Sequence, residues 1–185
     1  MKVWQLYTVG LLAALSWGAP AAAAGWNPQG ESQQLEVAEQ AIATFKATDS
    51  GLEVYFTKAY GWVIFPSIGK GGFVFSGAYR QGVAYQPGEP VGTAAVTQAS
   101  LGFTIGGQAS SELLFFRDQA ALQNFQAGKA EFSAQASAVI AREGAAAKTS
   151  YDNNGVAVFV HVLGGAMLEA SIRGQQFSYQ PGLGN

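Results

Sequence analysis

The chain has 185 residues, of which 10 are Lys or Arg, 12 are Asp or Glu, one is His and none is Cys. The absence of Cys excludes a disulfide, a Cys nucleophile, a Cys-rich zinc site and a lipid anchor attached through Cys. The small acidic excess is a poor electrostatic match for nucleic acid, so we expect no nucleic-acid partner.

Residues 1–24 have the pattern of a secretory signal peptide. Lys2 supplies the positive start, residues 3–17 are apolar, and residues 19–24 are small, as at a cleavage site. A membrane anchor is the alternative, but the apolar stretch falls short of the about 20 residues that a span needs. Cleavage near Ala24 leaves 161 of the 185 residues, with 9 basic against 12 acidic residues and a net charge of −3. We therefore expect an exported protein, periplasmic or extracellular, whose residues 25–185 form one domain.

The first predicted element of this domain is a helix that begins at Ser32 and ends at Gly51. Its apolar residues recur at helical spacing, and they are Leu35, Ala38, Ile42 and Phe45. Glu31, Glu36 and Glu39 disfavour a membrane-surface helix, which carries a basic polar face, so we interpret it as a helix packed on the domain. A second, short helix is predicted over residues 52–58.

From Trp62 onward the pattern changes to strands. Pro66 cannot donate to a sheet ladder and so ends the first strand, and a glycine-rich turn with Lys70 at its tip follows. A further strand is predicted over residues 131–140. Alternating apolar residues predict four more strand segments: Phe73, Phe75 and Tyr79; Leu101, Phe103 and Ile105; Val156, Val158, Val160 and Val162; and Ala166, Leu168, Ala170 and Ile172.

One helix is predicted among these strands, over residues 118–127. Asp118 caps it, Gly128 ends it, and its inner stripe is Ala121, Leu122 and Phe125. The elements together predict an α+β fold, a single domain dominated by antiparallel β-strands that form a barrel-like or strongly coiled sheet, with an N-terminal helix and one inserted helix. The 24 glycines permit the bends and close packing that such a sheet needs.

Residues that carry catalysis are scarce in this sequence. His161, the single His, has no ligand or catalytic partner near it in the valine run, which favours a partly buried, hydrogen-bonded side chain. Residues 152–155 lack the later Glu of a calcium loop, which favours a tight turn. The sequence leaves open whether any two of the glutamates on or near strands converge, namely Glu112, Glu131, Glu143 and Glu169. We expect neither an enzyme, nor a cofactor, nor a metal site.

Two blocks of the sequence resemble the signatures of the SYLF domain family. The first comprises Ala59-Tyr60-Gly61, Phe65-Pro66-Ser67 and Gly69-Lys70-Gly71-Gly72-Phe73, and the second runs from Gly164-Gly165-Ala166-Met167-Leu168-Glu169-Ala170 to Gln175-Gln176-Phe177-Ser178-Tyr179. The second block is similar to the secreted bacterial branch of the family. The resemblance covers residues 35–181, departs from the family pattern at residues 76–82, and implies a lipid-binding domain.

Several cationic and aromatic residues are candidates for contact with lipid. Lys and Arg at turns and strand ends contact phosphate through charge and hydrogen bonds, and aromatic rings supply an interfacial edge. The cationic candidates are Lys70, Arg80, Arg142, Lys148 and Arg173, and the aromatic candidates are Trp62 and Tyr79. Tyr85 is a further aromatic residue that can contribute to the same interfacial edge. For each cation the alternative is a solvated strand end or a charge that protects a sheet edge.

The resemblance and these candidates predict a noncatalytic lipid-binding protein of the bacterial cell envelope, which recognises phospholipid head groups or a membrane surface. Two alternatives remain open. One is a structural or protein-interaction module of the envelope without direct lipid binding, and the other is a carrier with an apolar cavity between the strands.

Overall fold

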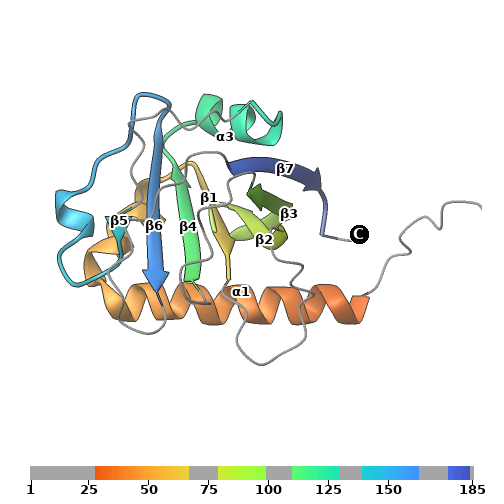
Figure 1. Ribbon diagram of the computed structural model, residues 1–185, viewed down its shortest axis with the longest axis horizontal. Coiled ribbons are helices and arrows are strands. Elements are labelled where there is room, and N and C mark those ends of the chain that lie inside the picture. Colours follow the sequence, from red (N-terminus) through yellow and green to blue (C-terminus); the bar gives the residue numbers. More distant parts are fainter. Residues whose placement is uncertain (1–27, 67–78, 99–109, 130–138, 163–174, 184–185) are drawn as a thin grey trace, which may run out of the picture.

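The computed structural model of the chain describes residues 28–66, 79–98, 110–129, 139–162 and 175–183. Its strands form one sheet, and helices pack on both faces of that sheet (Figure 1). In chain order they are α1 (Pro28–Thr48), the 3-10 helix η1 (Ser50–Leu52), α2 (Glu53–Lys58), β1 (Gly61–Phe65), β2 (Tyr79–Gln86), β3 (Glu89–Gln98), β4 (Ser110–Phe116), α3 (Gln119–Gln126), β5 (Val139–Ile140), the 3-10 helix η2 (Ala146–Lys148), β6 (Val156–Val162) and β7 (Gln175–Pro181).

The sheet has seven strands in the order β5-β6-β4-β1-β2-β3-β7. Five neighbouring pairs are antiparallel, and β5 pairs with β6 in parallel. The predicted α+β fold dominated by antiparallel strands is therefore confirmed, with a mixed sheet in place of a wholly antiparallel one. Among the described strands the sheet is open, with β5 and β7 at its edges, so the predicted barrel-like closure is not observed.

One face of the sheet is covered by α1 and α2. The α1 helix runs across the strands (Figure 1) and buries Ala38 and Phe45 against Ile64, Leu113 and other residues of that face. The predicted apolar stripe is confirmed, and α2 follows where the short helix was predicted. The α1 helix begins at Pro28, before the predicted start at Ser32, because proline is favoured in a first helical turn, where its missing N–H costs no hydrogen bond.

The opposite face of the sheet is covered by α3. Asp118 caps this helix, its buried residues are Ala121, Leu122 and Phe125, and Gly128 follows it with a φ of 67°. All three features agree with the sequence prediction. The left-handed conformation at Gly128 ends the helix, since a side chain would be strained there.

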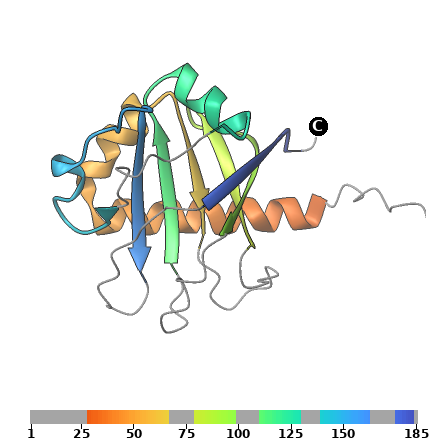
Figure 2. The same ribbon diagram turned by 45° about the horizontal axis from the view of Figure 1, so that its top comes forward.

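The α3-covered face is concave because the sheet curls strongly from β4 to β7. A Cβ added at Gly82 would lie 2.6 Å from the ring of Phe65, and one added at Gly92 would lie 2.7 Å from the ring of Tyr179, so each glycine lets an aromatic ring cross the strand backbone. Gln175 of β7 reaches Glu112 of β4 across this face, although β1, β2 and β3 lie between the two strands in the sheet. Figure 2 shows the strands fanning out from β6 to β7.

The strand predictions have mixed outcomes. The first strand ends at Phe65, directly before Pro66, and β6 has the predicted alternation, with Val156 and Val158 buried on the concave face. Only Val139–Ile140 of the predicted strand 131–140 is described, as β5. The glycine-rich turn with Lys70 and the segments 73–75, 101–105 and 166–172 lie outside the described residues. The strands β3, β4 and β7 were not predicted as such, and β2 begins at Tyr79, where the first predicted alternating set ends.

Candidate functional site

The structure brings two of the seven candidate residues together on one loop. Arg142 and Lys148 are both exposed in residues 142–149, between β5 and β6, and this segment is named the 142–149 loop below. Tyr79 and Arg80 open β2, where their backbones pair with Thr97 and Val96, but their side chains are outside the description. Lys70 and Arg173 lie outside the described residues altogether.

The 142–149 loop is held to the rest of the domain by a buried aspartate. Asp49 follows α1 and is 0% exposed. Its Oδ1 accepts hydrogen bonds from Gly51 N at 3.0 Å and from Gly144 N at 3.2 Å, and its Oδ2 accepts one from Ala146 N at 2.7 Å. A single carboxylate thus satisfies three backbone donors on two segments that are far apart in the sequence, and it fixes the path of the loop.

A tyrosine holds the far end of the same loop. The hydroxyl of Tyr55, in α2, donates to the Thr149 carbonyl at 2.5 Å. Burial raises the pKa of this tyrosine above its ordinary value, so the hydroxyl is protonated and available as a donor at neutral pH. Within the loop, Ala145 and Ala146 are buried, so its backbone is fixed by apolar packing as well as by hydrogen bonds.

The loop presents its charged side chains outward. Arg142, Glu143 and Lys148 are exposed, and Glu143 accepts a hydrogen bond from the Ser50 hydroxyl at 3.3 Å, so its carboxylate is turned toward η1. Gly144, with a φ of 76°, makes the sharp turn between the two cations, and the turn is closed by the bond from Ala145 N to the Arg142 carbonyl at 2.9 Å. Two cations on a short, fixed backbone can contact an anionic oxygen, such as that of a phosphate.

The predicted exposed aromatic edge is wrong for Trp62 and Tyr85. Trp62 is 6% exposed and Tyr85 is 5% exposed, and both belong to the core under α1. The reason is their register: the two residues lie directly opposite each other on β1 and β2, on the face that α1 covers. Their rings stack with centroids 5.7 Å apart and an interplanar angle of 11°.

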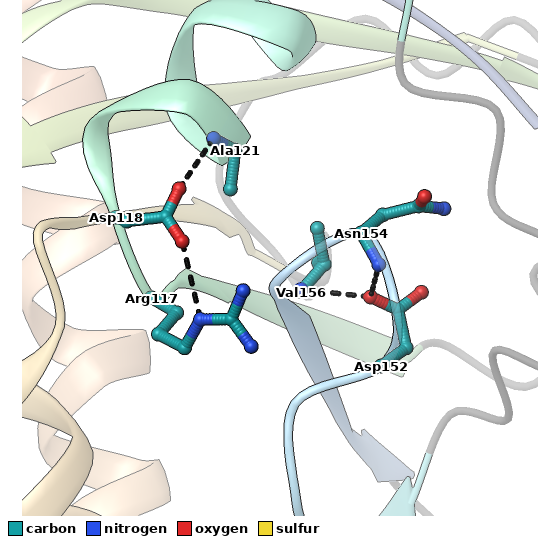
Figure 3. Close-up of polar contacts among 6 residues, drawn as sticks. All are labelled: Arg117, Asp118, Ala121, Asp152, Asn154 and Val156. Atoms are coloured by element: carbon teal, nitrogen blue, oxygen red, sulfur yellow. Dashed lines mark hydrogen bonds and ion pairs between the residues drawn. The ribbon is translucent and has the colours of Figure 1, made fainter.

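A second polar cluster lies directly after the C-terminal end of β4, where Arg117 and Asp118 face the turn before β6 (Figure 3). Asp118 accepts from Ala121 N at 3.0 Å and from Arg117 Nε at 3.1 Å, and the bond from Ala121 N is the main cause that lowers the pKa of its carboxyl. Asp152 Oδ1 accepts from Asn154 N and from Val156 N, both at 2.9 Å. The tight turn predicted for residues 152–155 is therefore confirmed, with Gly155 at a φ of 75°.

The other residues singled out for chemistry are dispersed. Glu112 is 2% exposed on the concave face, where its Oε2 accepts from Gln175 Nε2 at 3.2 Å, whereas Glu143 lies on the exposed 142–149 loop. His161 is half-buried, with its ring centroid 6.0 Å from that of Phe45. Glu131 and Glu169 are outside the description. Within the described ranges, no three His, Cys, Asp or Glu side chains lie close enough together to hold a metal ion.

The sequence analysis missed Asp49, although a local signal for it exists. Asp-Ser-Gly directly after a helix is typical of a side chain that accepts from a backbone N–H two residues later, and Asp49 makes that bond to Gly51. Nothing in the local sequence indicates its bonds to Gly144 and Ala146.

Comparisons of the chain with protein-family models and with curated proteins found no match. In the part of the chain that the structure describes, none of the helices has the length and apolar character needed to cross a membrane. The SYLF resemblance and the lipid-binding function that it implies therefore stay predictions.

Proposed function

We propose that the protein is a noncatalytic lipid-binding protein of the bacterial cell envelope, which contacts phospholipid head groups through exposed cations of its β-rich domain. The proposal takes its ligand class from the resemblance of residues 35–181 to the SYLF family. The structural observation that carries it is the 142–149 loop, on which Arg142 and Lys148 are exposed above a backbone that Asp49 and Tyr55 hold in place. In this proposal, residues 1–24 export the chain and are removed near Ala24.

The fixed backbone matters because the mature chain has no net positive charge to attract an anionic membrane. With 9 basic and 12 acidic residues, its long-range field is weakly repulsive. Binding must then come from short-range contacts, and a loop already ordered loses less conformational entropy when it binds. Two cations on one such loop supply contacts of this kind without a basic surface.

The described surface favours contact with head groups over insertion into the bilayer. Among the described residues, Val54, 53% exposed, is the one large apolar side chain that is exposed. Membrane-surface insertion requires a larger apolar face than this. The contacts expected of the described surface are therefore charge-assisted hydrogen bonds to phosphate oxygens.

Liposome flotation of the mature chain tests the proposal. We expect flotation with phosphatidylglycerol liposomes and a loss of roughly tenfold in binding for Arg142→Glu/Lys148→Glu, which is the effect of about 1.4 kcal/mol. The matched control is Lys58→Glu/Lys129→Glu, which changes the charge equally at two exposed lysines elsewhere and should bind like the wild type. Lys70→Glu tests the glycine-rich turn in the same assay.

Salt separates local contacts from diffuse attraction. Screening has a reach of about 8 Å at about 0.15 M salt, so added salt removes long-range attraction first. We expect binding to fall by a small factor between low and physiological salt. A loss of orders of magnitude, or equal losses in the two charge-reversed double variants, would show diffuse attachment and contradict the role of the loop. Absence of flotation, with a protein partner recovered by crosslinking, would instead favour the protein-interaction module.

A further inference from the structure

Two buried hydrogen-bond donors lie under α1. They are Nε1 of Trp62 and the hydroxyl of Tyr85, and among the described residues neither atom has a hydrogen-bond partner. The two side chains are 6% and 5% exposed. Buried donors in native proteins are nearly always satisfied by protein, by ordered water or by a ligand, because an unsatisfied one destabilises the fold. Two such donors on rings that stack on each other therefore indicate a place where an acceptor binds.

The pair lies beneath the junction of α1 and α2. Trp62 stacks on Tyr85 from the neighbouring strand, and the half-buried ring of Phe56, in α2, meets the indole edge-on at 5.3 Å between centroids. Lys46 Nζ, in α1, lies 4.6 Å from the centroid of that Phe56 ring. The groups packed on the indole from outside the sheet are thus side chains of the two helices.

The chemistry of the pair selects a neutral acceptor. The indole nitrogen can only donate. Burial, with the charge of Glu39 as a second cause, raises the pKa of Tyr85 to about 12, so its hydroxyl also carries its proton at neutral pH. The Glu39 carboxylate that disfavours the tyrosinate disfavours an anionic oxygen at the same place, since both are negative. A carbonyl oxygen satisfies the donors without this repulsion.

We infer that Trp62 and Tyr85, packed under α1 and α2, form a binding point for the ester carbonyl oxygens of a glycerolipid. The inference rests on the proposed lipid-binding function and adds the part of the lipid that is recognised. The two adjacent esters of a diacylglycerol unit offer two carbonyl oxygens, one for each donor.

The test compares an ester lipid with its ether analogue, which has the same head group and chains but no carbonyls. The probes are dihexanoyl phosphatidylcholine and the corresponding dihexyl ether lipid, both below the concentration at which they form micelles. In the mature chain, Trp26→Phe leaves Trp62 as the sole tryptophan, so its fluorescence reports on the site. We expect the ester lipid to shift this fluorescence and to bind roughly tenfold more tightly than the ether lipid, the effect of about one hydrogen bond.

Tyr85→Phe should abolish the preference for the ester lipid while leaving the thermal midpoint without lipid unchanged or higher, because it removes an unsatisfied hydroxyl. Tyr151→Phe is the matched control, a half-buried tyrosine packed against the same core, and should keep the preference. A Tyr85→Phe variant that is less stable without lipid and still prefers the ester would show that the hydroxyl binds a buried water, and the inference would be wrong.

The inference and the proposed function fail in different ways. Equal affinity for ester and ether lipids, in a wild-type chain that floats with liposomes, overturns the inference and leaves lipid binding intact. A wild-type chain that binds neither these lipids nor liposomes overturns both. If Tyr85→Phe does not fold, the comparison of the two lipids on the chain with native Tyr85 decides alone.

Discussion

Aspartates that accept backbone N–H groups fix loops at two places in this domain, and they do so over very different distances in the sequence. Asp49 is buried and accepts from Gly144 and Ala146, which lie 95 and 97 residues further along the chain. Asp118 and Asp152 accept, within the described ranges, from residues up to four positions away (Figure 3). The first arrangement joins two distant segments, whereas the second shapes a helix start and a turn.

This difference in distance predicts how much each aspartate contributes to the stability of the whole fold. Loss of Asp152 removes the acceptor of Asn154 N at a turn that is exposed, where water can take the place of the carboxylate. Loss of Asp49 leaves the buried N–H of Ala146 without an acceptor, where water cannot replace the carboxylate. The cost of removing each aspartate should therefore follow burial and the number of segments joined, and the three substitutions below are ordered by that expectation.

Asp49→Ala should have the largest effect. It removes the acceptor of three N–H groups, and we expect the free energy of unfolding in urea to fall by roughly 3–5 kcal/mol. Hydrogen exchange at the amides of Gly144 and Ala146 should accelerate in parallel. Asp49→Asn is the control, because it keeps one acceptor oxygen and should lose less. A fall within about 1 kcal/mol for Asp49→Ala would mean that packing of Ala145 and Ala146 alone holds the loop.

Asp152→Ala should have an intermediate effect. It removes the acceptor of Asn154 N and Val156 N at the turn before β6, and we expect the free energy of unfolding to fall by roughly 1–2 kcal/mol. Asp152→Asn retains an acceptor oxygen at the Oδ1 position and should be nearly neutral. If Asp152→Ala proves as costly as Asp49→Ala in the same urea titration, the distinction between local and long-range aspartates is lost.

The same distinction explains which parts of the fold could be predicted from the sequence. The α3 helix, its cap at Asp118, its stop at Gly128 and the turn at residues 152–155 depend on neighbouring residues, and all were predicted. The strand end at Pro66 was also predicted, since proline has no N–H to donate. In each case the physical cause lies within a few residues of its effect.

Long-range pairing left no such local signal. Trp62 and Tyr85 are buried because β1 and β2 place them opposite each other under α1, and the aromatic residues alone suggested an exposed edge. The contact between Glu112 and Gln175 depends on the curl of the sheet. Of the candidate site, the sequence indicated Arg142 and Lys148 but neither the loop that joins them nor Asp49 beneath it, because both depend on the tertiary fold.

Asp118 should have the smallest effect, and one that depends on pH. Asp118→Ala removes an N-cap and should lower the free energy of unfolding by about 1 kcal/mol at neutral pH. The bond from Ala121 N lowers the pKa of this carboxyl in the folded state below its ordinary value of 3.8. A carboxyl with a lowered folded pKa stabilises the fold above the unfolded pKa, and this stabilisation is lost as the pH falls through the folded pKa.

Asp118→Asn isolates the pH-dependent part of this effect, because an amide oxygen can cap the helix without titrating. The wild type should be slightly more stable than Asp118→Asn at about pH 7, and the difference should shrink as the pH falls below about 4, where the wild-type carboxyl takes up its proton. Urea titrations of both chains at several pH values measure that difference. A constant difference down to about pH 2 would show that the charge of Asp118 contributes nothing and that the geometry of the cap suffices. In that case any acceptor of the same shape could replace the local aspartate Asp118, whereas Asp49 must join two distant segments of the chain.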